Sequence, residues 1–288
     1  MVRVRIPGRR SGFPARSLRL PSLTFASLLL LSGCFVPVRE QLILERGYSG
    51  TRIEGDSIRV LCWNIQKKSG GRWQRDFLEI ARRYEPDLYL LQEAYLTGEL
   101  RELLGTLGLG WHLTPNLMAA GAGTYGGVLT ASSVLPAAET PLLSDYAEPI
   151  LGTNKAALAT LYRLPADREL LVLNVHGLNF VGLDRYRSQL EEIETRIAVH
   201  EGPVILSGDF NTWNRGRMKL LLETADRLGL ERMRFTERDE RHLRRFPFAH
   251  PLDHLFYRGL TPRAERSDVL ETVRSSDHLP IIVEFHLP

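Results

Sequence analysis

Cysteine is scarce in this 288-residue chain, which contains only Cys34 and Cys62. Two cysteines give no disulfide framework of the kind that holds small secreted domains together. Cys62 lies inside the apolar run 58–65, where a free cysteine is expected to behave as a small buried core residue. The fold must therefore be held by a hydrophobic core rather than by covalent cross-links.

Long apolar runs are also missing. The run at residues 23–31 falls short of the roughly 20 apolar residues that a membrane-spanning helix needs. No tandem repeat of fixed period is visible either, which excludes solenoid and propeller architectures. With 43% hydrophobic and 25% charged residues, the composition favours one large α/β domain.

A strongly basic domain is absent as well, although the formal net charge is +3. Residues 1–33 carry six arginines and no acid, so the remainder of the chain has a net charge of −3. Proteins that bind nucleic acid without sequence preference usually present a basic surface, because counterion release drives their affinity. Any such surface here must be local.

The N-terminal 33 residues have the layout of an export signal: an Arg-rich start followed by the apolar run 23–31. Leu31-Ser32-Gly33-Cys34 resembles the lipobox of bacterial lipoproteins, which implies that Cys34 becomes the lipidated first residue of the mature chain. The expected location is then extracytoplasmic, with the protein anchored to the membrane. The alternative is a misassigned start codon and a cytoplasmic protein.

We expect residues 34–55 to form a tether or an irregular lead-in, and residues 56–288 to form the domain. Two strand-like runs, 156–163 and 169–176, follow each other closely and predict a hairpin. Helices are predicted between other strands, so two packed sheets with helices outside fit best. The remaining predicted strands are 58–65, 87–92, 126–131, 203–208, 252–257 and 279–286. The predicted helices are 72–84, 97–107, 184–200 and 215–228, and the predicted long loops are 121–127 and 231–246.

Short polar motifs stand at the ends of these apolar runs. They are Trp63-Asn64, Gln92-Glu93, Asn174-Val175-His176, Gly208-Asp209-Phe210-Asn211, Leu252-Asp253 and Ser276-Asp277-His278. Polar residues that follow buried strands gather at one edge of a sheet. Phosphodiester cleavage needs a cation on the phosphoryl oxygens, a positioned water and a proton donor for the leaving oxygen. The motifs supply residues of each type.

Glu93 ends an apolar strand, where a carboxylate suits Mg²⁺, although a solvated acid at a strand end is equally simple. Gly208 permits a tight turn, after which Asp209 can orient or deprotonate water and Asn211 faces the same side. A simple Asx-turn would show the same spacing. The acid and imidazole of Asp277 and His278, placed together before another strand, favour the functional interpretation.

These six motifs, in this order, resemble the endonuclease/exonuclease/phosphatase superfamily, also called DNase I-like. The resemblance covers residues 58–287 and is greatest for small bacterial members. It implies a four-layer α/β/β/α sandwich with two packed mixed sheets. It further implies a Mg²⁺ or Mn²⁺ ion, with Glu93 as the principal ligand and with Asn64 and Asp277 completing or flanking the site.

The same resemblance assigns the acid–base residues. Asp209 and Asn211 would orient the attacking water and hold the phosphate. His278, hydrogen-bonded to Asp253, would act as general base or phosphate clamp. The sequence does not decide whether Asp209 or His278 takes the proton.

His176 separates the branches of that family. Abasic-site endonucleases usually have tyrosine at this position, whereas the DNase I, phosphoinositide phosphatase and sphingomyelinase branches have histidine. In DNase I a glutamate pairs with this histidine, but no acid occurs here between Leu103 and Ala138, so the pair looks incomplete. A buried core histidine is the alternative. Lys155, at a strand start, is a further candidate for phosphate contact. Trp213, Arg215 and Arg217 follow the Asp209 loop and are candidates for substrate contact, although a solvated helix start is an equally simple interpretation.

The sequence therefore predicts a divalent-metal-dependent phosphoesterase, and a phosphodiesterase in particular. Its substrate would be nucleic acid, a phospholipid headgroup or a small phosphorylated molecule, and its other partner the membrane, through the anchor at Cys34. No obligate protein partner is inferred. The alternative is a catalytically inactive binding module with the same fold.

Overall fold

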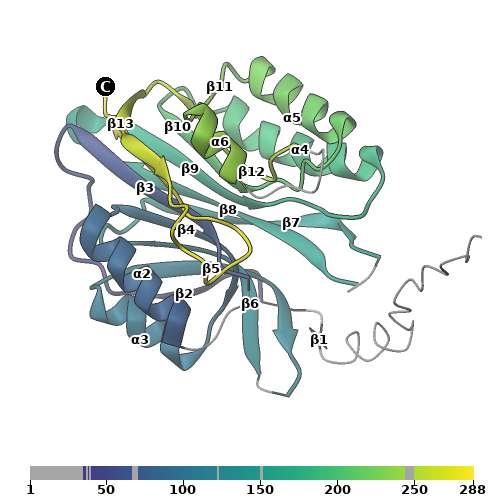
Figure 1. Ribbon diagram of the computed structural model, residues 1–288, viewed down its shortest axis with the longest axis horizontal. Helices are drawn as coiled ribbons and strands as arrows, with labels where there is room; N and C mark the ends of the chain where they lie inside the picture. The colour runs from purple at the N-terminus through teal and green to yellow at the C-terminus, as the bar shows by residue number, and fades with distance from the viewer. Residues whose placement is uncertain are drawn as a thin grey trace, which may run out of the picture.

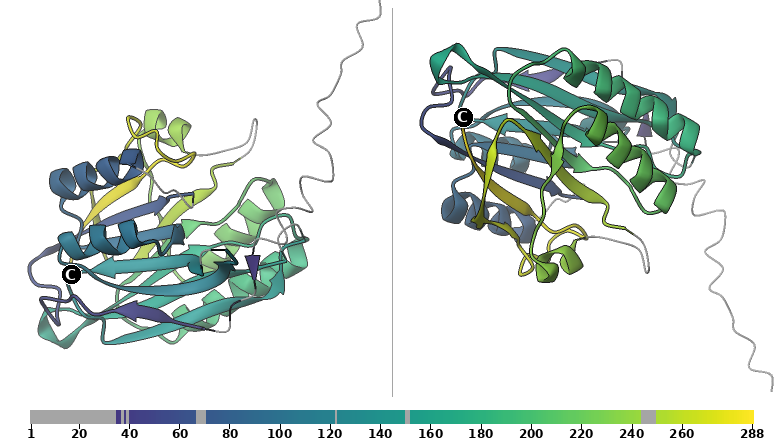
Figure 2. Two further views of the ribbon diagram at one scale, coloured as in Figure 1. Left: turned by 90° about the horizontal axis from the view of Figure 1, so that it is seen from below. Right: turned by 90° about the horizontal axis from the view of Figure 1, so that it is seen from above.

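The computed structural model describes residues 35–36, 38, 40–66, 71–121, 123–149, 152–243 and 250–288. Two β-sheets pack face to face, and helices cover their outer faces (Figure 1). Helices α2 (Gly71–Tyr84) and α3 (Gly98–Thr106) lie on the first sheet, and α4 (Leu183–Ala198) and α5 (Arg215–Arg227) lie on the second. Figure 2 shows this layering from two further sides. The predicted four-layer sandwich is confirmed.

The first sheet contains eight strands in the described part of the chain, in the order β1-β5-β6-β4-β3-β14-β13, with β2 also paired to β5. Strands β3 and β4 run parallel and the other pairs are antiparallel. The strands are β1 (Phe35–Val36), β2 (Ile43–Glu45), β3 (Ser57–Asn64), β4 (Leu88–Tyr95), β5 (Gly110–Ala119), β6 (Thr124–Ser132), β13 (Thr261–Val269) and β14 (Ile281–His286).

The second sheet has the order β11-β12-β10-β9-β8-β7. Among its described strands, β9 and β10 run parallel and the other pairs run antiparallel. Strands β8 and β9 form the predicted hairpin across a short 3₁₀ turn, Pro165–Asp167. The strands are β7 (Ala138–Ala147), β8 (Asn154–Arg163), β9 (Glu169–His176), β10 (Val204–Asp209), β11 (Glu231–Arg232) and β12 (Asp253–Arg258).

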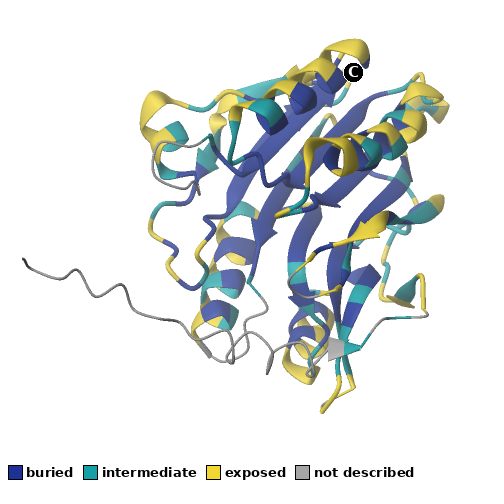
Figure 3. Cartoon of the chain, turned by 90° about the vertical axis from the view of Figure 1, so that its right-hand side faces the viewer, coloured by how far each residue is buried: buried dark blue, intermediate teal, exposed yellow. Residues whose placement is uncertain are grey.

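The central core lies between the two sheets. Apolar side chains from both, including Val60, Leu90, Val172 and Ile205, form one buried cluster, to which the predicted core residue Cys62 also belongs. Strands at the middle of each sheet are therefore buried on both faces, which explains their nearly continuous apolar sequences. Figure 3 shows these buried strands enclosed by helices whose outer surfaces are exposed.

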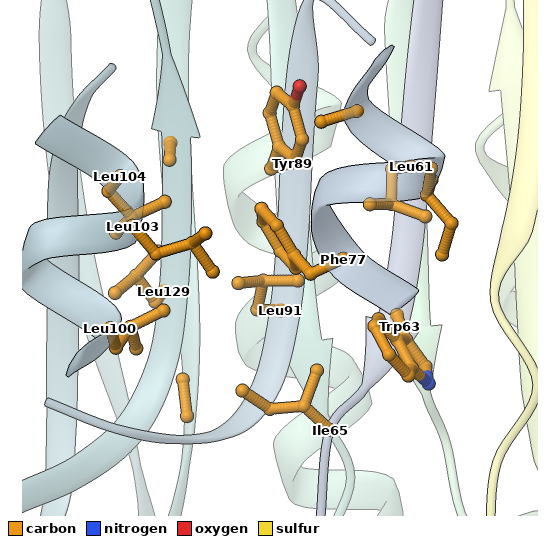
Figure 4. Packing of buried hydrophobic residues seen from close by; sticks show 14 of the residues in the cluster. Leu61, Trp63, Ile65, Phe77, Tyr89, Leu91, Leu100, Leu103, Leu104 and Leu129 are labelled. Carbon is orange, nitrogen blue, oxygen red and sulfur yellow. The ribbon is translucent and has the colours of Figure 1, made fainter. Parts of the chain in front are cut away.

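The first helical layer packs through aromatic and aliphatic side chains. Phe77 of α2 stacks on Tyr89 of β4 with ring centroids 5.5 Å apart, while Leu100 and Leu104 of α3 enter the same cluster (Figure 4). Thr97 caps α3, its side chain accepting a hydrogen bond from the Leu100 backbone. This layer fixes the outer face of the strand that carries Glu93.

Several segments that the sequence predicts to be irregular contain regular secondary structure. Within the expected lead-in, β2 pairs with β5 and Ile53 is buried, so this part packs on the domain. The predicted loop at 121–127 is wrong beyond residue 123, because β6 begins at Thr124. The predicted loop at 231–246 contains β11 and α6 (Glu237–His242), a short polar helix capped by Thr236.

The expected export signal and lipidation site precede the part of the chain that the structure describes. Residues 1–33 and Cys34 lie outside the described residues. In the ranges that the structure does describe, no helix is both long enough and apolar enough to cross a membrane.

Strand direction brings the polar motifs to one edge of the sandwich. The parallel strands β3 and β4 place Asn64 opposite Gln92, and the parallel strands β9 and β10 place His176 opposite Asp209. Strand β12 runs the other way and begins at Asp253, directly across from Asp209. The sheet pairing thus gathers residues that are up to about 190 positions apart in the chain.

Candidate active site

Asp209 stands at the end of β10, in a backbone position that Gly208 makes possible. Gly208 has a φ of +148°, and a Cβ placed there would lie 1.9 Å from the carbonyl oxygen of Val175. Only glycine permits this close approach of β9 and β10. The close approach brings Asp209 beside His176, the last residue of β9.

The loop after Asp209 is held by Asn211. Its backbone N–H donates to Oδ1 of Asp209 at 3.0 Å, and its side-chain amide donates to the Gly177 carbonyl at 2.9 Å. Asn211 adopts a φ of +52°, which asparagine tolerates better than most residues. The Asx-turn considered from the sequence is therefore present, and it aims the second oxygen of Asp209 at the site.

That oxygen, Oδ2 of Asp209, is the centre of the cluster. The side-chain amide of Asn64 donates to it at 3.0 Å, and the Nε2 atoms of His176 and His278 lie 3.7 and 3.8 Å away. Burial raises the pKa of Asp209 to about 6, although the positive charge of His278 opposes this rise. A buried carboxylate between two imidazoles is suited to accepting a proton.

His278 is paired on its other side with Asp253. Its Nδ1 lies 2.8 Å from Asp253 Oδ2, and the indole N–H of Trp63 donates to its backbone carbonyl at 3.0 Å. Burial alone would lower the pKa of His278. The charges of Asp253 and Asp209 outweigh burial and raise it to about 10. The predicted pairing of His278 with Asp253 is therefore present, and the imidazole is positively charged at neutral pH.

Glu93 reaches the site through an irregularity in β4. The pairing register with β6 shifts between Leu91 and Ala94, and Glu93 has a φ of +51°. Such a bulge turns a side chain out of the regular alternation of a strand. Oε1 of Glu93 lies 3.9 Å from His176 Nε2, and its side chain is 18% exposed. Of the other two predicted metal ligands, Asn64 is bonded to Asp209 and Asp277 is exposed beside His278.

Oxygen and nitrogen atoms that could hold a metal ion do converge here. Within the described ranges, ligand atoms of Asp209, Asp253 and His278 lie within 4.8 Å of one another, and all three residues are buried. The carboxylates of these residues and of Glu93 are the hard donors that divalent cations such as Mg²⁺ take. The donor set therefore fits a divalent cation, although this trio differs from the predicted ligands Glu93, Asn64 and Asp277.

Two motif residues have a structural role instead. Gln92 donates to Asn174 Oδ1 at 2.6 Å, and Asn174 donates to the Leu129 carbonyl at 2.9 Å. Both side chains are fully buried between the sheets. This hydrogen-bonded bridge satisfies their polar groups and joins the two sheets directly beneath the site.

The neighbour of His176 was not identified from sequence. Nζ of Lys155 lies 3.1 Å from His176 Nε2 and 3.5 Å from Glu148 Oε2, and Glu148 in turn accepts the Asn179 backbone N–H at 2.6 Å. Lys155 and Glu148 are both buried. In the sequence, only the position of Lys155 at the start of a strand pointed to this contact. The contact itself depends on how β8 pairs with β9, which the sequence does not specify.

Arg217 was considered as a possible substrate contact, but the structure buries it completely. Its guanidinium donates to the carbonyls of Leu178, Val181 and Asn211. Its planar group also lies over the rings of Tyr186 and Trp213, at 4.4 and 5.1 Å. Arg217 therefore ties the loop after His176 to the loop after Asp209.

Comparison with known proteins identifies a matching family model, described as the Endonuclease/Exonuclease/phosphatase family, over residues 61–278. A family protein from Bacteroides vulgatus matches with a TM-score of 0.62 and 15% identity, covering 81% of this chain and 100% of that one. The human Nocturnin catalytic domain matches with a TM-score of 0.60 and 18% identity, covering 86% and 97%.

A third structure, ANGEL2, is described as a 2',3'-cyclic phosphatase. It matches with a TM-score of 0.56 and 17% identity, covering 86% of this chain and 98% of that one. At such identities the likeness shows a shared fold and leaves the substrate of this chain open.

Proposed function

Since the chain belongs to the endonuclease/exonuclease/phosphatase family, we propose that it is a divalent-metal-dependent phosphodiesterase. One observation supports this proposal above the others: Asp209 Oδ2 lies between the Nε2 atoms of His176 and His278, with the amide of Asn64 donating to it. This is an acid–base arrangement buried at the end of two parallel strands. A module that only bound a ligand would have no need of it.

A divalent cation, Mg²⁺ or Mn²⁺, belongs to this proposal. Glu93 would be its principal ligand, with Asn64 and Asp277 beside it. Asp253 and His278 face each other at 2.8 Å, so we assign them to acid–base work rather than to the metal. When bound, the cation would polarise the phosphoryl oxygens and offset their charge.

The roles of the protein side chains follow from their partners. Asp209 would take the proton of the attacking water, because its carboxylate is oriented by Asn64 and by the backbone of Asn211. His278 would hold the phosphate as a cation, since Asp253 fixes its ring and favours its charged form. Asn211 would keep the loop after Asp209 in place.

Two substrate classes remain in the proposal: a nucleic acid, and a phospholipid headgroup or small phosphorylated molecule. The net charge of −3 after residue 33 favours the second class, because an extended nucleic-acid backbone usually meets a basic surface. ANGEL2, described as a 2',3'-cyclic phosphatase, and the endonuclease domain of TRAS1 illustrate that this fold serves more than one phosphoester reaction.

The test uses the purified full chain in mild detergent with bis-p-nitrophenyl phosphate. Turnover should require Mg²⁺ or Mn²⁺ and should stop with a chelator. Parallel assays on plasmid DNA, RNA, sphingomyelin and phosphoinositides would then identify the substrate class. Absence of metal-dependent turnover on every phosphoester would support the inactive binding module instead.

We also propose that Cys34 anchors the protein to a membrane outside the cytoplasm. The support is the order of an Arg-rich segment, an apolar run and Leu31-Ser32-Gly33-Cys34. In bacterial cells, the wild-type chain should incorporate a labelled fatty acid and fractionate with membranes. A Cys34→Ser variant should lose the label, whereas a Cys62→Ser variant should keep it. An unlabelled wild-type chain would instead support the cytoplasmic alternative.

A further inference from the structure

In the described ranges, Lys155 is the one lysine whose ammonium contacts the cluster formed by Asp209, His176 and His278. Its Nζ lies 3.1 Å from Nε2 of His176, the same atom that lies 3.7 Å from Asp209 Oδ2 and 3.9 Å from Glu93 Oε1. A lysine ammonium has hydrogens and no lone pair, so the imidazole nitrogen accepts in this contact. His176 therefore contacts a positively charged lysine, where the resemblance to DNase I led us to look for a glutamate.

The position of Lys155 is fixed from two sides. Glu148 Oε2 lies 3.5 Å from Nζ, and the other oxygen of Glu148 accepts the backbone N–H of Asn179 at 2.6 Å. Both charged side chains are more than nine-tenths buried, at 9% and 7% exposure. An ion pair at that depth gives Lys155 a defined position, because its flexible arm has little room to move.

This geometry leaves Lys155 capacity for one more partner. An ammonium carries three N–H bonds, and in the described part of the chain two of them have acceptors, on His176 and Glu148. The third has no protein acceptor in that region. It is available to an anionic oxygen bound beside Asp209.

On the basis of the proposed phosphodiesterase function, we propose that Lys155 is a further catalytic residue whose ammonium donates to a phosphoryl oxygen of the substrate, with His176 and Glu148 as positioning residues. Negative charge on the phosphoryl oxygens must be offset as the bond to the leaving group breaks. A fixed ammonium in a buried site does this more effectively than one in water. In this assignment His176 Nε2 accepts a hydrogen bond from Lys155 and so orients its ammonium.

A purely structural role would be that Lys155 only neutralises the buried carboxylate of Glu148. The two roles are separable, because removing Lys155 alone leaves Glu148 unpaired and risks the fold, whereas removing both charges does not. The informative variants are therefore K155M, E148Q and the E148Q/K155M double variant. Lys219, whose side chain is 72% exposed on α5, provides the matched control K219M.

The experiment measures kcat and KM on bis-p-nitrophenyl phosphate with Mg²⁺, together with the melting temperature of each full-length variant. We expect the double variant to melt near wild type and to have kcat lowered about 100-fold, as for loss of one transition-state donor. K219M should match wild type. Recovery of kcat to within threefold of wild type in the double variant would overturn the proposal and support the structural role.

A binding measurement gives an independent readout. Inorganic phosphate, titrated calorimetrically into the Mg²⁺-loaded protein, should bind the double variant at least about tenfold more weakly than it binds K219M, because one charge-assisted hydrogen bond is lost. Equal affinities would contradict the assigned contact. If the wild-type protein hydrolyses no phosphoester at all, the proposed function fails. If the wild-type protein and the double variant are equally active, only the role of Lys155 fails.

Discussion

The carboxylate of Asp253 lies 2.8 Å from Nδ1 of His278, although the two residues are 25 positions apart in the chain. The pair exists because β12 begins at Asp253 and lies directly across from Asp209 at the end of β10. The pair gives His278 a carboxylate neighbour. His176, which lies on the other side of Asp209, contacts the ammonium of Lys155 instead. The two histidines therefore share Asp209 but differ in their nearest other neighbour, and we expect them to have different roles.

The first prediction concerns Asp253→Asn. With Asp253 present, the pKa of His278 is about 10, so the imidazole stays charged through neutral pH and loses its charge only as the pH rises toward 10. Without that carboxylate, the pKa should fall toward the ordinary value for histidine, about 6.5. The alkaline limb of kcat/KM should then move to lower pH, with a loss of about 30-fold at pH 8, where only a small fraction of such an imidazole stays charged. An unchanged pH profile would contradict the clamp role, and the exposed Asp226→Asn is the control.

The second prediction concerns Glu93→Gln and metal binding. If Glu93 is the principal ligand, this substitution should weaken Mn²⁺ binding by at least about tenfold, as measured by calorimetry on the purified protein. Asp253→Asn should leave Mn²⁺ affinity within about threefold, because Asp253 serves His278. The reverse ranking would place the ion among Asp209, Asp253 and His278, whose ligand atoms also converge.

The third prediction tests the turn that places Asp209. Gly208→Ala should lower the free energy of unfolding by about 3 kcal/mol or more, since the new Cβ meets the Val175 carbonyl and the φ of +148° disfavours a side chain. Gly105→Ala is the matched control, because a Cβ there meets nothing within 4 Å inside helix α3. It should be neutral or stabilising by up to about 1 kcal/mol in urea unfolding.

The fourth prediction concerns acid stability. Burial lowers the pKa of His254 to about 3, and its Nε2 contacts Thr212 Oγ1 at 2.6 Å. Below pH 6.5 the unfolded chain gains a proton at this residue and the folded protein does not, so stability is lost as the pH falls from about 6.5 toward 3. The loss should be about 1 kcal/mol per pH unit.

The variant His254→Gln isolates this effect. Between pH 7 and pH 5, the free energy of unfolding of the variant in urea should fall less steeply than that of wild type. Parallel slopes for the two proteins would show that His254 does not carry the acid sensitivity.

Much of the fold was predictable because its central strands are buried on both faces. Strands such as β3 and β10 therefore appear in the sequence as continuous apolar runs. Strands at the edges give no such signal. Strand β13 is largely exposed and carries Arg263, Glu265, Arg266 and Asp268, so nothing in its sequence separates it from a loop. Helix α6 was missed for the same reason, since all six of its residues are polar or charged.

The site was predictable residue by residue but not contact by contact. The pairing of Asp253 with His278 was expected from the family resemblance and is present. The bulge that redirects Glu93 and the contact of His176 with Lys155 depend on strand register, which apolar patterning does not specify. The sequence also does not show burial of a charged side chain. Arg217 was a candidate for substrate contact, but it is fully buried and its guanidinium packs on the ring of Trp213.

The central claim is that Asp209 acts in a metal-dependent phosphoester hydrolysis. The most direct measurement compares the turnover of bis-p-nitrophenyl phosphate by wild-type protein and by Asp209→Asn, with Mg²⁺, after chelation, and after Mg²⁺ is restored. We predict wild-type turnover that is lost and regained with the metal, and a folded variant that is slower by about 1,000-fold or more throughout. Metal-dependent turnover in the variant close to the wild-type rate would contradict the claim.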